Sequence, residues 1–313
     1  MKNSPPLVSV GLLSYNRDKL IGLAIKSLLA QSYPNIEIII SDDASSDTSP
    51  VIAKTYARKH PSIRFYQQNE NLGIPENSHF VLQKAKGQFF MWASNDDTWN
   101  KEYIKELVQL LIKHPGASLA TSNLILSKGK LTQSSHLHFS KYSSGTKLIK
   151  DYLRKPSLLV WGIFRTSLLR KAGGFHVDGR PVYGGSDHVT VFNTLLLGGL
   201  ATTKKKLFYK TDSGYALDRF EQIKHHLLSW VLIKRMVRYV TYPLLFSYDL
   251  YYLISNTRTS TFSSVEKVRI VGWCVYWYIR VNLEIVFQTM VGIFYVVVSL
   301  LKNQSTKLKP QQK

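Results

Sequence analysis

Short apolar runs alternate with helical patterns along the first 125 residues, and this alternation constrains the fold more than any other feature of the chain. The apolar runs predict strands at Leu7–Leu13, Ile36–Ser41, Ile63–Gln67, Gln88–Ser94 and Ala117–Ile125. The periodic segments between them predict helices at Arg17–Gln31, Ser49–Lys59, Glu76–Lys86 and Lys101–Lys113. Strands and helices in this order form βαβ units, so we expect an α/β fold with a doubly wound, mostly parallel sheet.

Acidic side chains stand at three predicted strand-to-helix junctions. Asp43 follows the apolar run Ile36–Ile40, the pair Asp96 and Asp97 follows the strand that ends at Ser94, and Asp187 opens a leucine-rich helical pattern. Ligands of open parallel sheets bind beyond the carboxyl ends of the strands, so these carboxylates should face a crevice rather than a core. A side chain that recognises a nucleotide base, a metal ligand and a general base all need such positions.

Composition bounds the organisation of the chain. With 313 residues, of which 44% are apolar, it can hold one large α/β domain with an appendage or two modest domains. The single Cys274 excludes an internal disulfide. We expect a catalytic domain at residues 1–220 and a helical, aromatic and basic region at residues 221–313.

The positive charge is concentrated in the second part of the chain. Residues 1–100 carry ten Lys and Arg against nine Asp and Glu, and residues 101–313 carry 31 against 11. The basic residues lie singly or in short runs among aromatic and aliphatic residues, a pattern that favours an anionic membrane surface over nucleic acid. A merely solvated basic surface would look similar.

The sequence of the C-terminal region predicts that the protein associates with the membrane without passing through it. Ile285–Leu301 is nearly all apolar but has only 17 residues, which is the short limit for a span. The N-terminus shows no secretory signal, so we expect a cytoplasmic protein that is peripheral or monotopic on the inner face of the membrane. In that arrangement Trp273, Trp277 and Tyr278 would lie at headgroup depth. These helices could instead pack on the catalytic domain as ordinary core.

A polar stretch separates the predicted strands from the later motifs. Lys128–Thr146 is rich in Ser and Lys and lacks periodicity, which predicts a surface loop near the acceptor side.

Four motifs in a fixed order now suggest a family. They are VSVGLLSYNR at Val8–Arg17, QSYPNIEIIISDDASSDTS at Gln31–Ser49, NENLGIPEN at Asn69–Asn77 and GQFFMWASNDDTW at Gly87–Trp99. A weaker FRTSLLRKAGGF at Phe164–Phe175 leads to GGSDH at Gly184–His188. Over roughly residues 5–205 the chain resembles the family-2 glycosyltransferases with the GT-A fold, and the order and spacing of the motifs make the resemblance specific.

The resemblance implies an inverting transferase that moves a sugar from a nucleoside-diphosphate sugar, which we expect to be UDP-linked, to a hydroxyl of a glycan or lipid-linked acceptor. It implies nucleotide binding by Ser14, Tyr15, Asp43, Asn77 and Asp96, with Asp43 accepting the imide N–H of uracil. Asp97 would ligate Mg²⁺ or Mn²⁺, and Asp187 would be the catalytic base. This chemistry is coherent, because a cation neutralises the departing diphosphate and inversion needs a base opposite the leaving group.

The sequence departs from the family pattern at two places. Ser94 and Asn95 precede Asp96 where the family usually has a further acid, and Glu76 stands where a basic residue often precedes Asn77. Arg64, Lys84 or the run Lys204–Lys206 could supply the missing positive charge.

Other interpretations remain open. Each of the acidic positions could simply cap a helix or a turn. A nucleotidyltransferase also uses a doubly wound sheet and acidic metal sites, but it normally has a Gly-rich phosphate loop where this chain has Ser14-Tyr15-Asn16-Arg17. A non-catalytic membrane or nucleic-acid binding protein could retain the fold, although the complete set of Asp43, Asp97 and Asp187 argues against decay.

Overall fold

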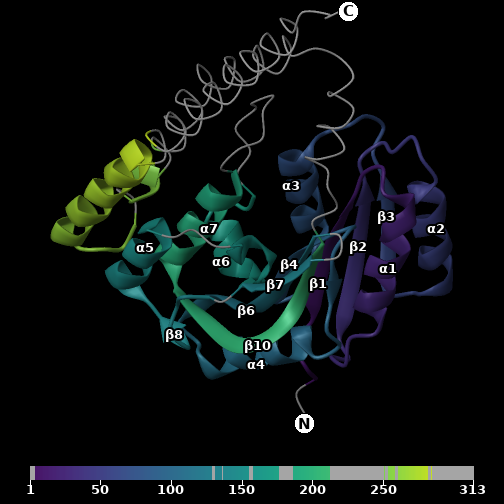
Figure 1. Ribbon diagram of the computed structural model, residues 1–313, viewed down its shortest axis with the longest axis horizontal. Helices are drawn as coiled ribbons and strands as arrows, with labels where there is room; N and C mark the ends of the chain where they lie inside the picture. Colours follow the sequence, from purple (N-terminus) through teal and green to yellow (C-terminus); the bar gives the residue numbers. More distant parts are fainter. Residues whose placement is uncertain are drawn as a thin grey trace, which may run out of the picture.

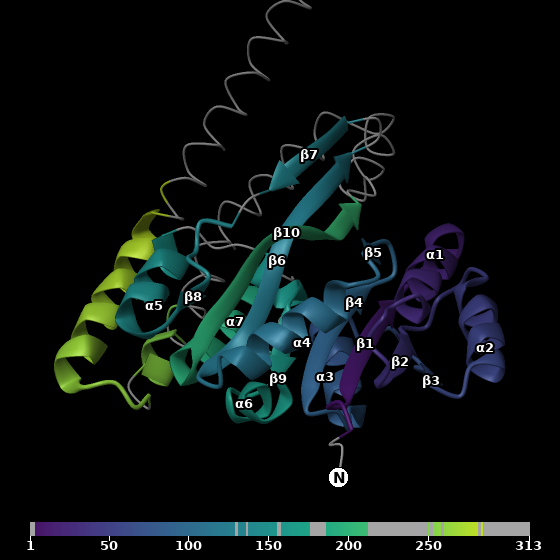
Figure 2. The same cartoon turned by 90° about the horizontal axis from the view of Figure 1, so that it is seen from below.

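The computed structural model describes residues 4–128, 131–135, 137–154, 158–175, 186–211, 250, 253–257, 260–280 and 283. Within these residues ten strands form one mixed, mostly parallel sheet that is covered by helices on both faces (Figures 1 and 2). The main path of the sheet runs β3-β2-β1-β4-β9-β6-β10-β5, with β7 paired to β6 and β8 paired to β10. The predicted α/β class is therefore confirmed.

The predicted strands and helices of the first 128 residues are present, with ends that shift by up to three residues. The strands are β1 (Val8–Ser14), β2 (Ile36–Asp42), β3 (Ile63–Gln67), β4 (Phe89–Ser94), β5 (Thr98–Trp99) and β6 (Ala117–Lys128). The helices are α1 (Asp18–Leu29), α2 (Ser49–Lys59), α3 (Ile74–Lys84) and α4 (Tyr103–Lys113).

The later part of the described chain adds shorter strands and helices. The strands are β7 (Leu131–Ser135), β8 (Tyr142–Ser143), β9 (Ile163–Arg165) and β10 (Gly199–Thr211). The helices are α5 (Gly145–Arg154), the single 3₁₀ turn η1 (Leu159–Trp161), α6 (Thr166–Lys171) and α7 (Ser186–Leu197).

The sheet has a parallel half and a mixed half. β3, β2, β1 and β4 are all parallel, and β1 aligns Val8 with Ile36 of β2 and with Phe89 of β4. β9 then lies antiparallel between β4 and β6, while β6 and β10 are parallel to each other. Because β4 and β6 are both antiparallel to β9, their carboxyl ends point the same way.

Each strand sends alternate side chains into two separate apolar clusters, as its period of two residues requires. In β4, Phe89 and Met91 join the cluster under α1, α2 and α4, whereas Phe90 and Trp92 join the cluster under α3, α5 and α7. Gly11 of β1 lets α3 approach closely, because a Cβ there would lie 2.6 Å from a methyl of Val81.

The predicted surface loop over Lys128–Thr146 is wrong in part. Leu131–Ser135 pairs with β6 and Tyr142–Ser143 pairs with β10, so both pieces extend the sheet. The stretch lacks a hydrophobic period because it forms edge strands, which are stabilised by main-chain hydrogen bonds more than by burial.

A further helix, residues 264–280, packs on the helices that cover one face of the sheet. Ile270, Cys274 and Trp277 belong to the apolar cluster under α3, α5 and α7, and Trp277 is only 5% exposed. Trp273 and Tyr278 pack against the same cluster, so the predicted placement of these aromatic side chains at headgroup depth is wrong. Their apolar rings gain more from burial in the protein core.

The rest of the predicted membrane region, including Ile285–Leu301, lies outside the described residues. No helix in the part of the chain that the structure describes is long and apolar enough to cross a membrane. The boundary between residues 1–220 and 221–313 stays a prediction.

Candidate active site

A cavity of about 520 Å³ opens at the carboxyl ends of β1, β2 and β4. We call it the strand-end cavity. Its walls include all five residues that the sequence predicts to bind nucleotide. It is lined by Leu13, Ser14, Tyr15, Arg17, Asp43, Asn71, Gly73, Ile74, Asn77, Ser94, Asn95, Asp96 and Trp161.

Asp43 is held rigidly at the cavity wall. Its two carboxylate oxygens accept hydrogen bonds from the backbone N–H groups of Leu72 (2.8 Å) and Gly73 (3.0 Å). The side chain is 4% exposed, and burial raises the pKa of this carboxyl despite the two backbone donors. Each carboxylate oxygen has a second lone pair, so Asp43 can still accept a proton donor from a ligand.

Asp42 is structural, in contrast with its neighbour. It accepts hydrogen bonds from the Ser14 hydroxyl (3.0 Å) and from both the backbone N–H (2.9 Å) and the hydroxyl of Ser45. These bonds tie the end of β1 to the loop after β2. The turn interpretation of the pair Asp42–Asp43 is therefore right for Asp42, while Asp43 remains at the cavity wall.

Asn77 places an unsatisfied acceptor at the cavity. Its side-chain nitrogen donates to the carbonyl of Ser41 at 3.3 Å, but its Oδ1 is buried without a hydrogen-bond partner. A buried polar atom without a partner costs about 1–3 kcal/mol. A ligand N–H or O–H in the cavity would remove that cost.

Asp96 and Asp97 face different surroundings although they are adjacent. Asp96 lines the strand-end cavity and accepts a hydrogen bond from the Ser94 hydroxyl. Asp97 is fully buried and accepts from Lys210 Nζ (3.3 Å) and from the backbone N–H of Thr211 (2.9 Å). Burial raises the pKa of Asp97 to about 6, although the Lys210 charge acts in the opposite direction.

This donor set suits a cation whose shell is completed by substrate. Within the described residues, no group of three or more His, Cys, Asp or Glu side chains could hold a metal ion. Mg²⁺ and Mn²⁺ with phosphate substrates commonly use only one or two carboxylates, with phosphate oxygens and waters as the other ligands. Asp96 and Asp97 can supply that number.

Asp187 lies in the first turn of α7 and is not in the described lining of the strand-end cavity. Residues 176–185, which lead into this helix, lie outside the described residues, so the expected strand-to-helix junction at Asp187 stays a prediction. Its charge acts on the buried hydroxyl of Tyr152, whose pKa is raised well above its usual range mainly by burial and then by Asp187. Tyr152 in turn donates to the backbone carbonyl of His188 at 3.1 Å.

The basic residues that the sequence offered as replacements for the missing positive charge do not line the strand-end cavity. Arg64 binds Glu37 at 2.8 Å, and Lys84 lies over the rings of Tyr66 and Phe80. Lys205, from the run Lys204–Lys206, pairs with Glu106. None of these side chains is in the described lining of the strand-end cavity.

Three residues that the sequence did not single out contribute to the site instead. Arg17 and Trp161 line the strand-end cavity, and Lys210 combines its ion pair to Asp97 with a position 5.1 Å from the centre of the Trp161 ring. Arg17 could have been suspected from its place directly after β1. Lys210 and Trp161 carry no local signal, because they reach the site from distant parts of the sheet.

The model of the family described as "Glycosyl transferase family 2" matches residues 9–171, more than half of the chain. The chain belongs to this family. The order of the motifs in the sequence predicted this family.

Curated relatives match over the N-terminal part. An uncharacterized glycosyltransferase of Rickettsia typhi is 37% identical over 108 residues, which is 34% of this chain and 33% of the relative. TuaG of Bacillus subtilis, named provisionally as a teichuronic acid biosynthesis glycosyltransferase, is 32% identical over 113 residues, 36% of this chain and 45% of the relative. The matched stretch thus spans less than half the length of either relative.

Solved structures extend the likeness of fold beyond that stretch. TarS residues 1–349 of S. aureus, in complex with UDP-GlcNAc, superpose with a TM-score of 0.67 at 19% identity, covering 87% of this chain and 72% of TarS. The mannosyltransferase PcManGT of Pyrobaculum calidifontis, in complex with GDP-Man and Mn²⁺, gives 0.56 at 16% identity, covering 99% of this chain and 82% of that chain. At these identities the likeness establishes the fold, which is GT-A.

Proposed function

We propose that the protein is an inverting, UDP-sugar-dependent glycosyltransferase that extends a glycan or lipid-linked acceptor. The observation that carries this proposal is the convergence of Ser14, Tyr15, Asp43, Asn77 and Asp96 on one cavity at the carboxyl ends of the parallel strands. TarS was crystallised with UDP-GlcNAc, which supports a UDP donor for a chain of the same fold.

Asp43 and Asn77 are suited to read the base and ribose. An ionised carboxylate accepts the N3–H of uracil but repels the N3 lone pair of cytosine, so Asp43 favours UDP over CDP donors. The unsatisfied Oδ1 of Asn77 accepts a ribose hydroxyl or a base N–H. Tyr15, which is 40% exposed, covers the base.

Asp96 and Asp97 would hold Mg²⁺ or Mn²⁺, and a bound cation would neutralise the charge on the departing diphosphate. Asp96, which lines the cavity, and Asp97, which is buried next to it, would be its protein ligands. Lys210 holds the Asp97 carboxylate in place and contributes a fixed positive charge near the same position. The Mn²⁺ complex of PcManGT supports this assignment.

Asp187 takes the proton of the acceptor hydroxyl as it attacks the anomeric carbon. Inversion requires this base on the side opposite the leaving group, and Asp187 is not among the described residues that line the strand-end cavity, which would hold the diphosphate. The Nδ1 of the neighbouring His188 lies 3.2 Å from the Tyr152 hydroxyl and is engaged there. Asp187 is therefore the better base of this pair.

We also propose that residues 264–283 dock on an anionic membrane. Thirteen large hydrophobic side chains are exposed among the described residues, and six of these lie in this one segment: Val265, Val268, Val275, Tyr276, Ile279 and Leu283. Their spacing places them along one side of a helix, opposite the side that packs on the protein. The excess of Lys and Arg in residues 101–313 complements an anionic lipid surface.

A panel of UDP-, GDP-, CDP- and dTDP-sugars, screened by thermal shift and then by donor hydrolysis with Mn²⁺, tests the activity. UDP-sugars should stabilise the protein most and should be hydrolysed only with the cation present. Equal stabilisation by CDP-sugars would overturn the role of Asp43.

Flotation with anionic vesicles tests the membrane surface. Ile279→Glu should lose vesicle binding, whereas the control Ile112→Glu on α4, where the side chain is similarly exposed, should keep it. Equal flotation of both variants would reject this segment as the docking surface.

A further inference from the structure

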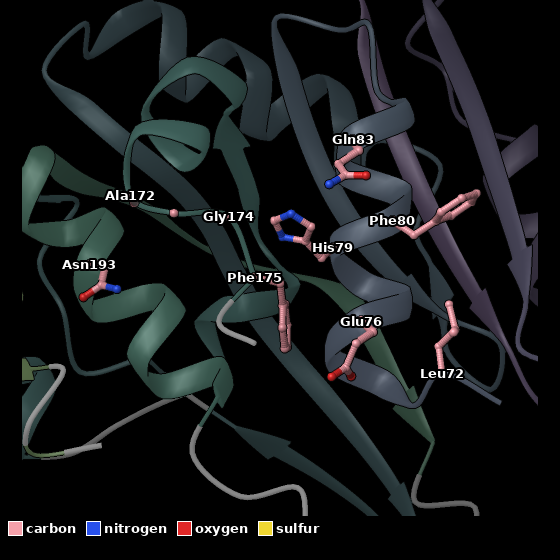
Figure 3. Close-up of a pocket in the computed structure, with 10 residues that line it drawn as sticks. Leu72, Glu76, His79, Phe80, Gln83, Ala172, Gly174, Phe175 and Asn193 are labelled. Atoms are coloured by element: carbon pink, nitrogen blue, oxygen red, sulfur yellow. The ribbon is translucent and has the colours of Figure 1, made fainter. Parts of the chain in front are cut away.

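A second cavity of about 520 Å³ lies beside helix α3 (Figure 3). Its opposite wall is formed by the turn that follows α6 and by helix α7. We call it the α3–α7 cleft. Its size falls in the range of small-molecule sites, which is about 300–1,000 Å³. Leu72, Phe80 and the turn Ala172–Phe175 complete its walls around the polar side chains described next.

Helix α3 presents a polar face to this cleft. Glu76, His79 and Gln83 stand three and four residues apart, which places them on one side of the helix. All three point toward α7 in Figure 3, away from Phe80 and Leu72. A helix side that faces another helix is normally apolar, so three adjacent polar side chains there indicate a wet, ligand-accessible gap rather than packing.

His79 carries an unsatisfied polar atom in this cleft. Its Nδ1 is buried and has no hydrogen-bond partner in the protein. Gly174 packs against the same edge of the ring, because an added Cβ there would lie 3.2 Å from this nitrogen. Gly174 has a φ of 73°, a conformation that favours glycine, so the turn is built to approach the imidazole closely.

The opposite wall adds an amide and an aromatic ring. Asn193 of α7 accepts a hydrogen bond from Asn256 through its Oδ1 at 2.9 Å, and its amide nitrogen is directed toward the cleft in Figure 3. Phe175 is fixed by an edge-on contact with Trp92, with ring centres 5.1 Å apart. The cleft thus offers carboxylate, imidazole and amide groups beside an apolar ring.

The cleft is next to the strand-end cavity. Gly73 and Asn77 of the α3 start line the strand-end cavity, whereas Leu72 and Glu76 line the cleft, so the two share the first turn of this helix. Burial raises the pKa of Asp43, and the Glu76 charge adds to this shift. Asn193 and Asp187 are both in α7, six residues apart, which is about 9 Å along the helix axis at 1.5 Å per residue.

We propose that the α3–α7 cleft binds a sugar ring of the acceptor glycan, next to the residue that receives the transferred sugar. A pyranose presents several hydroxyls that both donate and accept, together with an apolar C–H face. Glu76 accepts hydroxyl protons, Asn193 donates, and Gln83 and His79 can do either. The inference rests on the proposed transferase activity, because an acceptor subsite has a role only beside a working donor site.

Two near-isosteric variants test the proposal. His79→Phe keeps the ring and removes its nitrogens, and Gln83→Leu removes one amide from an exposed position. The matched control is Gln109→Leu, which changes an exposed glutamine on α4. The probe is a panel of p-nitrophenyl glycosides of the common hexoses and N-acetylhexosamines, and binding is measured by saturation-transfer NMR.

We expect one or more glycosides to bind the unaltered protein and to shift the imidazole resonances of His79. His79→Phe and Gln83→Leu should each weaken this binding about tenfold, the value of one lost hydrogen bond of about 1.4 kcal/mol. UDP binding and donor hydrolysis should stay unchanged in both variants, and Gln109→Leu should match the unaltered protein in every measurement.

Three outcomes would overturn the inference: no glycoside binds, binding leaves His79 unshifted, or the variants bind as well as Gln109→Leu. If His79→Phe fails to fold, Gln83→Leu decides by itself. Loss of UDP-sugar hydrolysis in the unaltered protein is a different failure, since it would reject the proposed donor chemistry while glycoside binding could still be measured.

Discussion

The parallel and the mixed halves of the sheet build their parts of the site in different ways. In the parallel half, Asp43 receives both of its backbone hydrogen bonds from Leu72 and Gly73, in the loop after the neighbouring strand. In the mixed half, Asp97 is paired with Lys210, 113 positions away along the chain. The first arrangement comes from consecutive βα units, and the second exists only because β10 returns to pair with β5, directly after Asp97, and with β6.

This contrast suggests a division of labour. The parallel half offers a preorganised cavity whose polar groups are fixed by nearby backbone, which suits recognition of a constant donor. The second half combines Lys210, Trp161 and α7 from distant segments, which suits chemistry and a variable acceptor. If so, changes in the parallel half should affect donor affinity, and changes in the second half should affect turnover.

The largest effect is expected from Asp187→Asn in α7. The substitution keeps the shape and removes the base, so kcat should fall by about 10²–10⁴. Donor Kd, measured by calorimetry with UDP-sugar, should stay near its original value. If donor binding fell as much as kcat, Asp187 would act in donor binding, and the proposed difference between the two halves of the sheet would be wrong.

Removal of the cation ligand should come next. Asp97→Ala, or EDTA with the unaltered protein, should lower kcat at least about a hundredfold, because several kcal/mol of stabilisation of the departing diphosphate would be lost. Mn²⁺ titration followed by electron paramagnetic resonance, with UDP present, separates lost metal binding from misfolding. Asp96→Ala is the companion variant, and retention of Mn²⁺ binding by Asp97→Ala alone would assign the cation to Asp96.

Asp43→Asn should lower the affinity for the donor, and it should lower kcat less than the Asp187 and Asp97 variants do. A hydrogen bond to a charged group contributes about 1.5–3 kcal/mol, so UDP affinity should fall about 10- to 150-fold. Calorimetric titration with UDP and CDP gives the result directly. An unchanged preference for UDP over CDP would show that another group reads the base.

The smallest effect is expected from Lys210→Met, and it depends on pH. Asp97 has a pKa of about 6 in the folded protein against an ordinary value of 3.8, so folding takes up a proton between these values. The contribution of Asp97 to stability therefore falls as pH rises from about 4 through 6. At pH 7, Lys210→Met should lower the free energy of unfolding by about 1–2 kcal/mol. The loss is limited because Asp97 can take up a proton when the lysine charge is absent.

Urea denaturation in EDTA at pH 5 and pH 7 measures this dependence. At pH 5 Asp97 is already largely protonated, so the difference between Lys210→Met and the unaltered protein should shrink. An equal difference at both pH values would mean that Lys210 stabilises the fold by packing on Trp161 rather than through Asp97.

Local pattern predicted most of the parallel half. The period-two and period-3.6 patterns placed β3 and α2 to the residue, and they located the carboxylates at the ends of β2 and β4. Strand and helix periodicity are local properties, and the carboxyl ends of parallel strands necessarily meet at one edge. That is why Asp43 and Asp96 could be expected at one cavity, whereas Ser14 and Asn77 were expected there only from the family resemblance.

Sequence reasoning failed where pairing is non-local. The polar segment around β7 and β8 has no hydrophobic period, so only its partners β6 and β10 make it part of the sheet. The aromatic residues near Trp277 satisfy a membrane pattern and a core pattern equally well, and the apolar cluster under α3, α5 and α7 decided between them.

The sequence by itself determined the class of fold, the family and the carboxylates that follow the strands, because these depend on local periodicity and motif order. Only the tertiary structure decided that Asp96 faces the cavity while Asp97 is buried against Lys210, and that Glu76, His79 and Gln83 share a cleft with Asn193. Exposure and pairing of this kind depend on which distant segments of the chain lie next to each other. The free energy of burying the whole apolar core determines this, and no local sequence signal reports it.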